Sequence, residues 1–245
     1  MNKFKFLFIN ILLCLSMTLS AKDYKASLFG VKSDGIVTNT GSIQYAIDYI
    51  SENGGGNLVF YVGRYITGSI QLKSNVKIKL MEGAVLVGSP SVYDYKGEKN
   101  NMALIIAENQ ENIGISGKGV IQGRGASLLT LVANQIKKGY CSSQEAPALI
   151  SMKECSNINI EGVIMLDGSG TVQKYDKCKK LAIKNITVKS KTIPESCGLI
   201  LLNGDEVKVE DSFFDTSDTE IKLKSNSRIS IINCVNAKGK KLHGK

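Results

Sequence analysis

A short pattern of alternating apolar and polar residues recurs through the chain. Each copy has a polar residue, an apolar one, any residue and a second apolar one, and a turn-forming residue lies five positions after its start. The main copies start at Asn112, Asn157, Lys180, Glu206 and Arg228, and their turn-formers are Gly117, Gly162, Asn185, Asp211 and Asn233. Earlier copies start at Asn57 and Asn75. Gly, Asn and Asp tolerate left-handed backbone angles, and the period of two predicts strands rather than helices.

The spacing of these copies predicts how the strands assemble. The starts at positions 157, 180, 206 and 228 lie 23, 26 and 22 residues apart. Repeats of this length are typical of a solenoid, in which each unit buries its apolar face only by stacking on the next. We therefore predict an all-β fold, a parallel β-helix with strands about 4.8 Å apart. Two inward ladders should line its core: Ile113, Ile158, Leu181, Val207 and Ile229, and then Ile115, Ile160, Ile183, Val209 and Ile231.

Two segments have helical spacing instead. In Thr40–Glu52 the apolar positions are Ile43, Ala46, Ile47 and Ile50. Asn39 or Thr40 can cap its start, and the glycines at 54–56 end it. We expect this helix to cover the N-terminal end of the solenoid, where strand edges would otherwise lie open. In Ala126–Gly139 the apolar positions are Leu128, Leu129, Val132 and Ile136, which predicts a helical insertion followed by a loop at Cys141–Ala148.

The first 21 residues have the order of a secretory signal peptide. Lys3 and Lys5 precede an apolar run at Leu7–Leu19, and small residues follow at Ser20 and Ala21. The apolar run is too short for a comfortable membrane span. We therefore predict a signal peptide at 1–21, a single β-helix domain at 22–245, and a secreted or periplasmic location without membrane contact after cleavage.

Composition and charge narrow the possible partners. The chain is 43% hydrophobic and 22% charged, which excludes a disordered or collagen-like chain. Its net charge is +9, and removal of Lys3 and Lys5 leaves +7. A basic exported protein suits an acidic polysaccharide, although solubility alone accounts for the charge equally well. Only three of the 31 basic residues are Arg, namely Arg64, Arg124 and Arg228, so we expect no nucleic-acid partner.

Histidine and cysteine usage limits the chemistry. The only histidine is His243, so we expect neither a metal nor a catalytic triad, and no cofactor. Five cysteines follow the leader, at 141, 155, 178, 197 and 234, with no zinc-like spacing, and buried free thiols are the simplest interpretation. Cys155 and Cys178 both stand two residues before a repeat start. Stacked coils would make these two neighbours, within reach of a disulfide.

The N-terminal half carries motifs that resemble a known family. These are Phe29–Gly35, the glycines at 54–56, Gly63–Gly68, Glu82–Leu86 and Ile115–Gly123. Together they resemble glycoside hydrolase family 28, the polygalacturonase-like pectinases, over residues 26–234. The resemblance implies a right-handed parallel β-helix, a substrate cleft along one face and inverting hydrolysis of galacturonan.

The catalytic motifs of that family are depleted here. The family has an Asn-Thr-Asp-Gly segment, an Asp-Asp pair one coil later, a Gly-His-Gly and an Arg-Ile-Lys. Cys197 stands where the first segment has its Asp; Asp218 matches the first Asp of the pair, and Thr219 replaces the second. Residues 236–239 replace the Gly-His-Gly, and no Arg-Ile-Lys follows. The resemblance thus implies Asp218 as general acid without its partners, and a turn Asp is the alternative.

Other side chains near these positions are candidates for binding or catalysis. Lys222 and Lys224 are the candidate ligands for uronic-acid carboxylates, and Lys184, Lys189 and Lys208 are further ones, although alternating Lys on a strand is usually its solvated face. Asp215 and Glu220 could form a replacement carboxylate pair. Cys197 has no base beside it in the pattern and is expected to be an idle thiol. Four tyrosines could stack on sugars or pack in the core: Tyr65, Tyr93, Tyr95 and Tyr175.

We therefore expect an exported, family 28-like β-helix protein directed at pectic, galacturonate-containing polysaccharide, with little or no hydrolysis. Two alternatives stay open: galacturonan hydrolysis that uses Asp218, and a truncated product with no independent role. The basic tail, Val235–Lys245, is expected to fold over the C-terminal end of the coils or to meet a second chain there.

Overall fold

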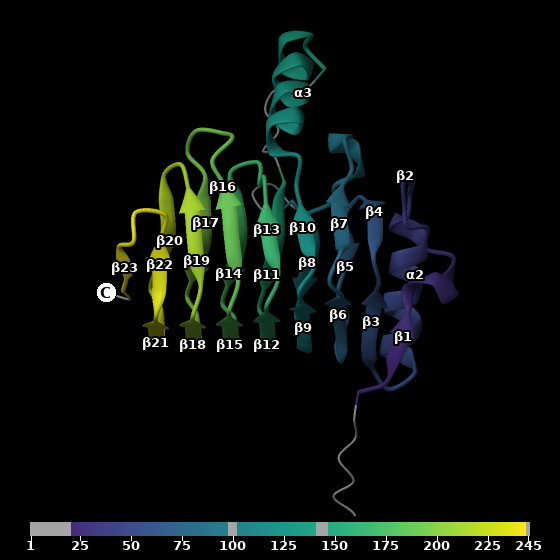
Figure 1. Ribbon diagram of the computed structural model, residues 1–245, viewed down its shortest axis with the longest axis horizontal. Coiled ribbons are helices and arrows are strands. Elements are labelled where there is room, and N and C mark those ends of the chain that lie inside the picture. Colours follow the sequence, from purple (N-terminus) through teal and green to yellow (C-terminus); the bar gives the residue numbers. More distant parts are fainter. Residues whose placement is uncertain (1–20, 98–101, 141–146, 244–245) are drawn as a thin grey trace, which may run out of the picture.

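The alternating apolar positions stack into three sheets in the computed structural model, which describes residues 21–97, 102–140 and 147–243 (Figure 1). The first sheet has the order β1 (Asp23–Lys25), β3 (Gly56–Phe60), β6 (Val76–Leu80), β9 (Glu111–Gly117), β12 (Ser156–Glu161), β15 (Lys179–Lys184), β18 (Asp205–Glu210) and β21 (Ser227–Ile232). The second has the order β2 (Asp34–Thr38), β4 (Gly63–Thr67), β7 (Ala84–Gly88), β10 (Val120–Gln122), β13 (Ile164–Leu166), β16 (Thr187–Ser190), β19 (Phe213–Thr216), β22 (Cys234–Asn236) and β23 (Lys241–Leu242). The third has the order β20 (Thr219–Lys224), β17 (Cys197–Leu202), β14 (Thr171–Asp176), β11 (Ala148–Lys153), β8 (Ala103–Glu108) and β5 (Ile70–Gln71).

Successive coils add one parallel strand to each sheet, which gives the predicted right-handed parallel β-helix. Both predicted ladders are confirmed by the strand register. Ile158 pairs with Ile113 and Leu181, and the ladder continues through Val207 to Ile229. The second ladder runs in the same way from Ile115 to Ile231. The apolar interior is therefore built from equivalent positions of consecutive coils.

The repeat copy assigned at Asn57 was wrong by two residues. Asn57 pairs with Lys77, and Gly56 pairs with Val76, so Gly55 rather than Asn57 lies over Asn75. Gly55 has φ 88°, and a Cβ there would come within 2.5 Å of the Asn75 carbonyl oxygen. Only glycine fits that approach, and the polar Asn57 gave a misleading start to the pattern.

Residues with left-handed backbone angles lie at both ends of the strands of the first sheet. All five predicted turn-formers have positive φ, between 50° and 114°. The starts of the five main copies have positive φ as well, which the sequence pattern did not predict: Asn112, Asn157, Lys180, Glu206 and Arg228. The chain thus bends at both ends of each strand, and this gives the solenoid its corners.

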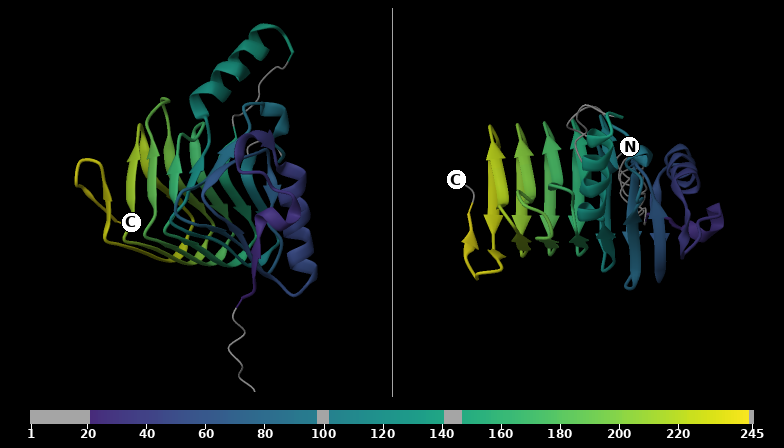
Figure 2. Two further views of the ribbon diagram at one scale, coloured as in Figure 1. Left: turned by 45° about the vertical axis from the view of Figure 1, so that its right-hand side comes forward. Right: turned by 90° about the horizontal axis from the view of Figure 1, so that it is seen from above.

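The predicted N-terminal helix is confirmed as α2 (Thr40–Glu52), which packs against β3 and β5 at the end of the coils (Figure 2). Its buried residues are the four that were predicted: Ile43, Ala46, Ile47 and Ile50. The predicted capping was wrong, because the Asn39 side chain makes no cap hydrogen bond. Its amide instead holds the preceding loop, where its oxygen accepts a 2.7 Å bond from the Lys32 N–H. A short 3-10 turn, η1 (Ala26–Phe29), leads into this region.

The second predicted helix is α3 (Gly125–Lys137), which stands out from the coils between β10 and β11 (Figure 2). Leu128 and Val132 are buried as predicted, whereas Ile136 is 41% exposed because the end of the helix leaves the body. A 3-10 turn, η2 (Val92–Asp94), contacts α3. The predicted loop, Cys141 included, lies outside the described residues up to position 146, as does most of the predicted signal peptide. Among the described residues, no helix is both long and apolar enough to cross a membrane.

The described cysteines are buried free thiols, as predicted. Cys155 and Cys178 are neighbours on consecutive coils, since the Lys179 N–H donates a 2.9 Å bond to the Cys155 carbonyl. Their thiols are hydrogen-bonded to each other but form no disulfide. This hydrogen bond, together with burial, raises the pKa of Cys178.

The C-terminal end of the coils is covered only in part. β23 turns back and pairs antiparallel with β22, and Leu242 packs against the core. The expectation that the tail folds over this end therefore holds for the second sheet. Apolar residues of β20 and β21 stay only half-buried, namely Ile221, Leu223, Ile229 and Ile231.

Candidate functional site

The outward-pointing residues of the third sheet form a surface along the coils that mixes charged, polar and a few apolar side chains, and we call it the outer face. Strand register aligns them in two rows. One row is Gln71, Ile106, Ser151, Lys174, Ile200 and Lys222, and the next is Glu108, Lys153, Asp176, Leu202 and Lys224. The alternate residues of the same strands point inward into the core. Lys side chains exceed carboxylates in these rows, so the outer face is basic.

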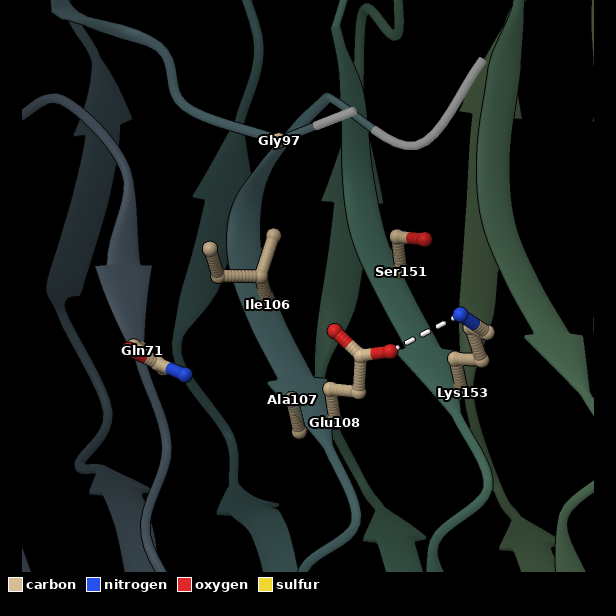
Figure 3. Close-up of a pocket in the computed structure, with 7 residues that line it drawn as sticks. All are labelled: Gln71, Gly97, Ile106, Ala107, Glu108, Ser151 and Lys153. Carbon is tan, nitrogen blue, oxygen red and sulfur yellow. Dashed lines mark hydrogen bonds and ion pairs between the residues drawn. The ribbon is translucent and has the colours of Figure 1, made fainter. Parts of the chain in front are cut away.

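The N-terminal part of the outer face is hollowed. Figure 3 shows Gln71, Ile106 and Ser151 around this hollow, with an ion pair of 2.8 Å between the Glu108 carboxylate and the Lys153 ammonium. Two of these residues, Gln71 and Ile106, also line a larger hollow of about 500 Å³ that reaches α2. The two hollows share these two lining residues, and we call them together the α2 groove.

Asp218 lies at the other end of the outer face, in the turn between β19 and β20. Its side chain is exposed and accepts a 2.9 Å hydrogen bond from the Thr219 hydroxyl. The backbone N–H groups of Asp218 and Thr219 both donate to the Ser196 carbonyl, at 3.3 Å. The turn is therefore fixed against the preceding coil, while its carboxylate faces solvent.

The two depleted motif segments meet as the resemblance implied. Cys197 pairs directly with Thr219 across β17 and β20. The Cys197 thiol is buried, and burial raises its pKa, while the nearby Lys222 partly opposes this and Asp218 adds to it. A protonated thiol is a poor nucleophile, which supports the interpretation of Cys197 as an idle thiol.

Asp215 and Glu220, the candidate replacement carboxylate pair, lie on different sheets and have different partners. Asp215 lies on the second sheet, where its carboxylate forms an ion pair of 2.5 Å with Lys191. Glu220 lies on the third sheet and accepts a 2.7 Å hydrogen bond from the Asn236 side-chain amide. Each carboxylate has its own partner, because neighbouring positions in sequence fall on different sheets.

Lys222 and Lys224 alternate along β20 and are both exposed on the outer face. They are thus on the strand that follows the turn that holds Asp218. The other candidate lysines are elsewhere, with Lys184 and Lys208 on the first sheet and Lys189 on the second. The sequence pattern could not separate these groups, because exposed Lys alternates along the strands of every sheet.

Three of the four candidate tyrosines are core residues. Tyr175 is 1% exposed and donates a 3.0 Å hydrogen bond to the Gln173 side-chain oxygen inside the coils. Tyr65 and Tyr95 are also buried, with their hydroxyls bonded to the carbonyls of Tyr61 and Ser89. Of the four, Tyr93 alone is exposed.

Sequence reasoning missed the residues of the α2 groove. Tyr45 on α2 is 62% exposed, and Lys73 and Lys96 come from the loops after β5 and η2. One signal was present, because Tyr45 falls on the polar side of the helical pattern, where a large aromatic residue is unexpected. The lysines gave no such signal.

Within the described ranges, no three His, Cys, Asp or Glu side chains gather as metal ligands would. Asp218 is the one family catalytic position that keeps a carboxylate. The basic outer face is suited to acidic groups of an extended ligand.

Known proteins share both sequence and fold with this chain. A model of the glycosyl hydrolases family 28 matches residues 59–244. The crystal structure of a candidate glycosyl hydrolase from Parabacteroides merdae superposes with a TM-score of 0.87 and 42% identity, over 91% of this chain and 100% of that chain. The family 28 exopolygalacturonase of Yersinia enterocolitica shares the fold, with a TM-score of 0.79 and 20% identity over 89% of this chain and 49% of that chain.

A sequence relative is the exo-poly-α-D-galacturonosidase of Dickeya chrysanthemi. It is 32% identical over 114 residues, which make up 40% of this chain and 19% of that enzyme. The chain spans less than half the length of the curated relatives it matches.

Proposed function

The chain belongs to glycosyl hydrolase family 28, and we propose that it is an exported protein that binds pectic, galacturonate-containing polysaccharide and hydrolyses it weakly or not at all. Relatives named as polygalacturonases support the class of polysaccharide. The order of charged, apolar and small residues at positions 1–21 supports export.

The observation that carries the proposal is that the carboxylate partners expected beside Asp218 are replaced or already engaged. Inverting hydrolysis needs a carboxylic acid for the leaving oxygen and a carboxylate base for water, about 6.5–9.5 Å apart. Cys197 and Thr219 pair where the resemblance places two further Asp residues. The nearby acids, Asp215 and Glu220, are held by Lys191 and Asn236. Asp218 thus lacks the two carboxylate partners that the resemblance implies beside it, and the acids nearest to it on β19 and β20 are already engaged.

Binding of an acidic polysaccharide requires fewer precisely placed groups than its hydrolysis. The exposed lysines of the outer face can pair with carboxylates of a galacturonate chain, and exposed ion pairs of this kind weaken as salt rises. A basic surface also raises the rate at which an acidic polymer is captured. These contacts do not depend on a general base.

The test combines binding and turnover. Polygalacturonate is added to the purified protein; bound polymer is measured by titration calorimetry at low and high salt, and new reducing ends are measured over hours. We expect salt-sensitive binding and no more reducing ends than the Asp218→Asn variant gives. Robust turnover that vanishes in Asp218→Asn would establish an efficient hydrolase instead. Absence of both binding and turnover would reject the proposal.

A further inference from the structure

The α2 groove includes a hollow of about 500 Å³ at the N-terminal end of the outer face. One wall is the exposed side of α2, with Gln44, Tyr45 and Asp48. Gln44 joins this wall to the sheet, because its side-chain oxygen accepts a 2.8 Å bond from the Gln71 N–H and its amide donates a 3.1 Å bond to the Gln71 carbonyl. The groove therefore has a rigid base on which a ligand could rest.

Only some of the charged side chains that line the groove form ion pairs. Lys153 is paired with Glu108, and Asp48 accepts a 3.0 Å hydrogen bond from the Gln44 amide. Lys73 and Lys96 also line the groove, and neither forms an ion pair with any described residue. The Asp48 carboxylate keeps its negative charge, because its hydrogen-bond partner is a neutral amide, so the two lysines leave the groove with a net positive charge, which favours an anionic ligand.

Tyr45 adds a stacking surface. Its ring is 62% exposed, yet it lies against two other aromatic rings, with centroids 6.2 Å from Phe29 and 6.4 Å from Tyr49. These contacts hold the ring on the α2 wall while its free face stays open. An amphipathic aromatic ring fixed in this way can pack on the apolar face of a sugar with little loss of side-chain entropy.

We propose that the α2 groove is the principal saccharide-binding site, in which Lys73 and Lys96 pair with uronate carboxylates and Tyr45 packs on a sugar ring. This rests on the proposed function and locates its binding step. The groove begins at β5, and Asp218 precedes β20; these are the two edge strands of the third sheet. Five strand spacings of about 4.8 Å separate them, or roughly 24 Å. Binding at the α2 groove therefore does not require the depleted catalytic positions.

The experiment titrates trigalacturonate into the full protein and into matched variants, and follows the dissociation constant by calorimetry. We expect Lys73→Ala/Lys96→Ala to weaken binding about tenfold and Tyr45→Ala about fivefold, while Tyr45→Phe retains it. Removal of the same charge from the first sheet in Lys77→Ala/Lys179→Ala, and of an exposed ring elsewhere in Tyr140→Ala, should leave affinity within about twofold. The neutral trigalactose should bind much more weakly, because it lacks the carboxylates.

The outcomes separate this inference from the proposed function. If Lys222→Ala/Lys224→Ala weakens trigalacturonate binding and the groove variants do not, the site is at the other end of the outer face, and the inference is wrong while the proposed function stands. If the unaltered protein binds neither trigalacturonate nor polygalacturonate, both are wrong. Circular dichroism of each variant establishes that it is folded, since Lys73, Lys96 and Tyr45 lie outside the buried core.

Discussion

The N-terminal and C-terminal parts of the β-helix share one backbone and differ in how their ends are covered. At the N-terminal end, α2 covers the first coils, and its four apolar residues are fully buried. At the C-terminal end, Ile229 and Ile231 continue ladders whose preceding members, Val207 and Val209, are at most 1% exposed, yet they are only half-buried themselves. An apolar side chain at the same ladder position thus contributes less to the stability of the fold where no further coil stacks on it.

The two parts also differ at the corner before the first sheet. In the N-terminal coils Asn75, Asn112 and Asn157 stack there, joined by side-chain hydrogen bonds of 2.9 and 2.6 Å. In the C-terminal coils Lys180, Glu206 and Arg228 occupy the corner, and the Arg228 guanidinium pairs with Glu206 at 2.8 Å. The backbone is left-handed in both sets. The N-terminal coils thus use Asn, which tolerates a left-handed backbone well. The C-terminal coils use Lys, Glu and Arg, which tolerate it less well and interact through their charges.

The largest effect is expected from a charge inside a coil that is covered on both sides. Ile183→Asp should prevent soluble folding, because an unpaired buried charge costs several kcal/mol. Ala182→Asp, on the same strand but pointing outward, should fold with a far-ultraviolet spectrum like that of the unaltered protein. Soluble yield and circular dichroism make the measurement. Equal tolerance at both positions would refute the inward and outward assignment.

The next effect compares the two ends directly. Ile47→Ala at the covered end should lower the free energy of unfolding by about 2–5 kcal/mol, because it leaves a cavity under α2. Ile231→Ala at the open end should cost about half as much or less, since its side chain is already partly in water. Urea unfolding of both variants measures this difference. Equal losses would mean that the open end is covered in solution.

A smaller effect on stability is expected at the corner before the first sheet, where the N-terminal coils have Asn and the C-terminal coils have charged residues. Asn157→Ala should lower the free energy of unfolding by about 1–2 kcal/mol, because it breaks the bond to Asn112 and places a less tolerant residue at φ 53°. Lys180→Asn should raise it by about 0.5–1 kcal/mol, because Asn suits the left-handed backbone at that position. Thermal unfolding of the pair is the measurement, and a loss of stability in Lys180→Asn would contradict the explanation.

The smallest effect depends on pH and salt. The hydrogen bond from Arg228, with a second from Ser227, holds the pKa of the Asp205 carboxyl well below its usual range. A lowered pKa in the folded state stabilises the protein above the usual Asp value, and this contribution is lost as the pH falls below about 4. Arg228→Gln should therefore lose less stability on acidification than the unaltered protein. The difference should shrink in high salt, because the pair is exposed; identical acid-unfolding curves would show that the pair contributes nothing.

The sequence-based predictions succeeded where the pattern lies within a short segment of the chain, and failed where the geometry depends on a neighbouring coil. The ladders through Ile158 and Ile160 were found because strand alternation and a repeat length are properties of short segments and their spacing. The bounds of α2 were found for the same reason. The failures at Asn57 and at the Asn39 cap came from glycines and a loop whose geometry depends on the coil beside them. Tyr175 was ambiguous because an amphipathic ring can face either side of a strand.

The sequence by itself determined the family, the parallel β-helix fold, the two core ladders of the first sheet and the bounds of α2, because each is carried by residue types at fixed spacing. Only the tertiary structure decided which side chains share a surface. Register placed Cys197 against Thr219 and sent Asp215 and Glu220 to different sheets. It also brought Tyr45, Lys73 and Lys96 into one groove. Contacts of this kind join residues whose separation along the chain carries no period, so no local pattern contains them.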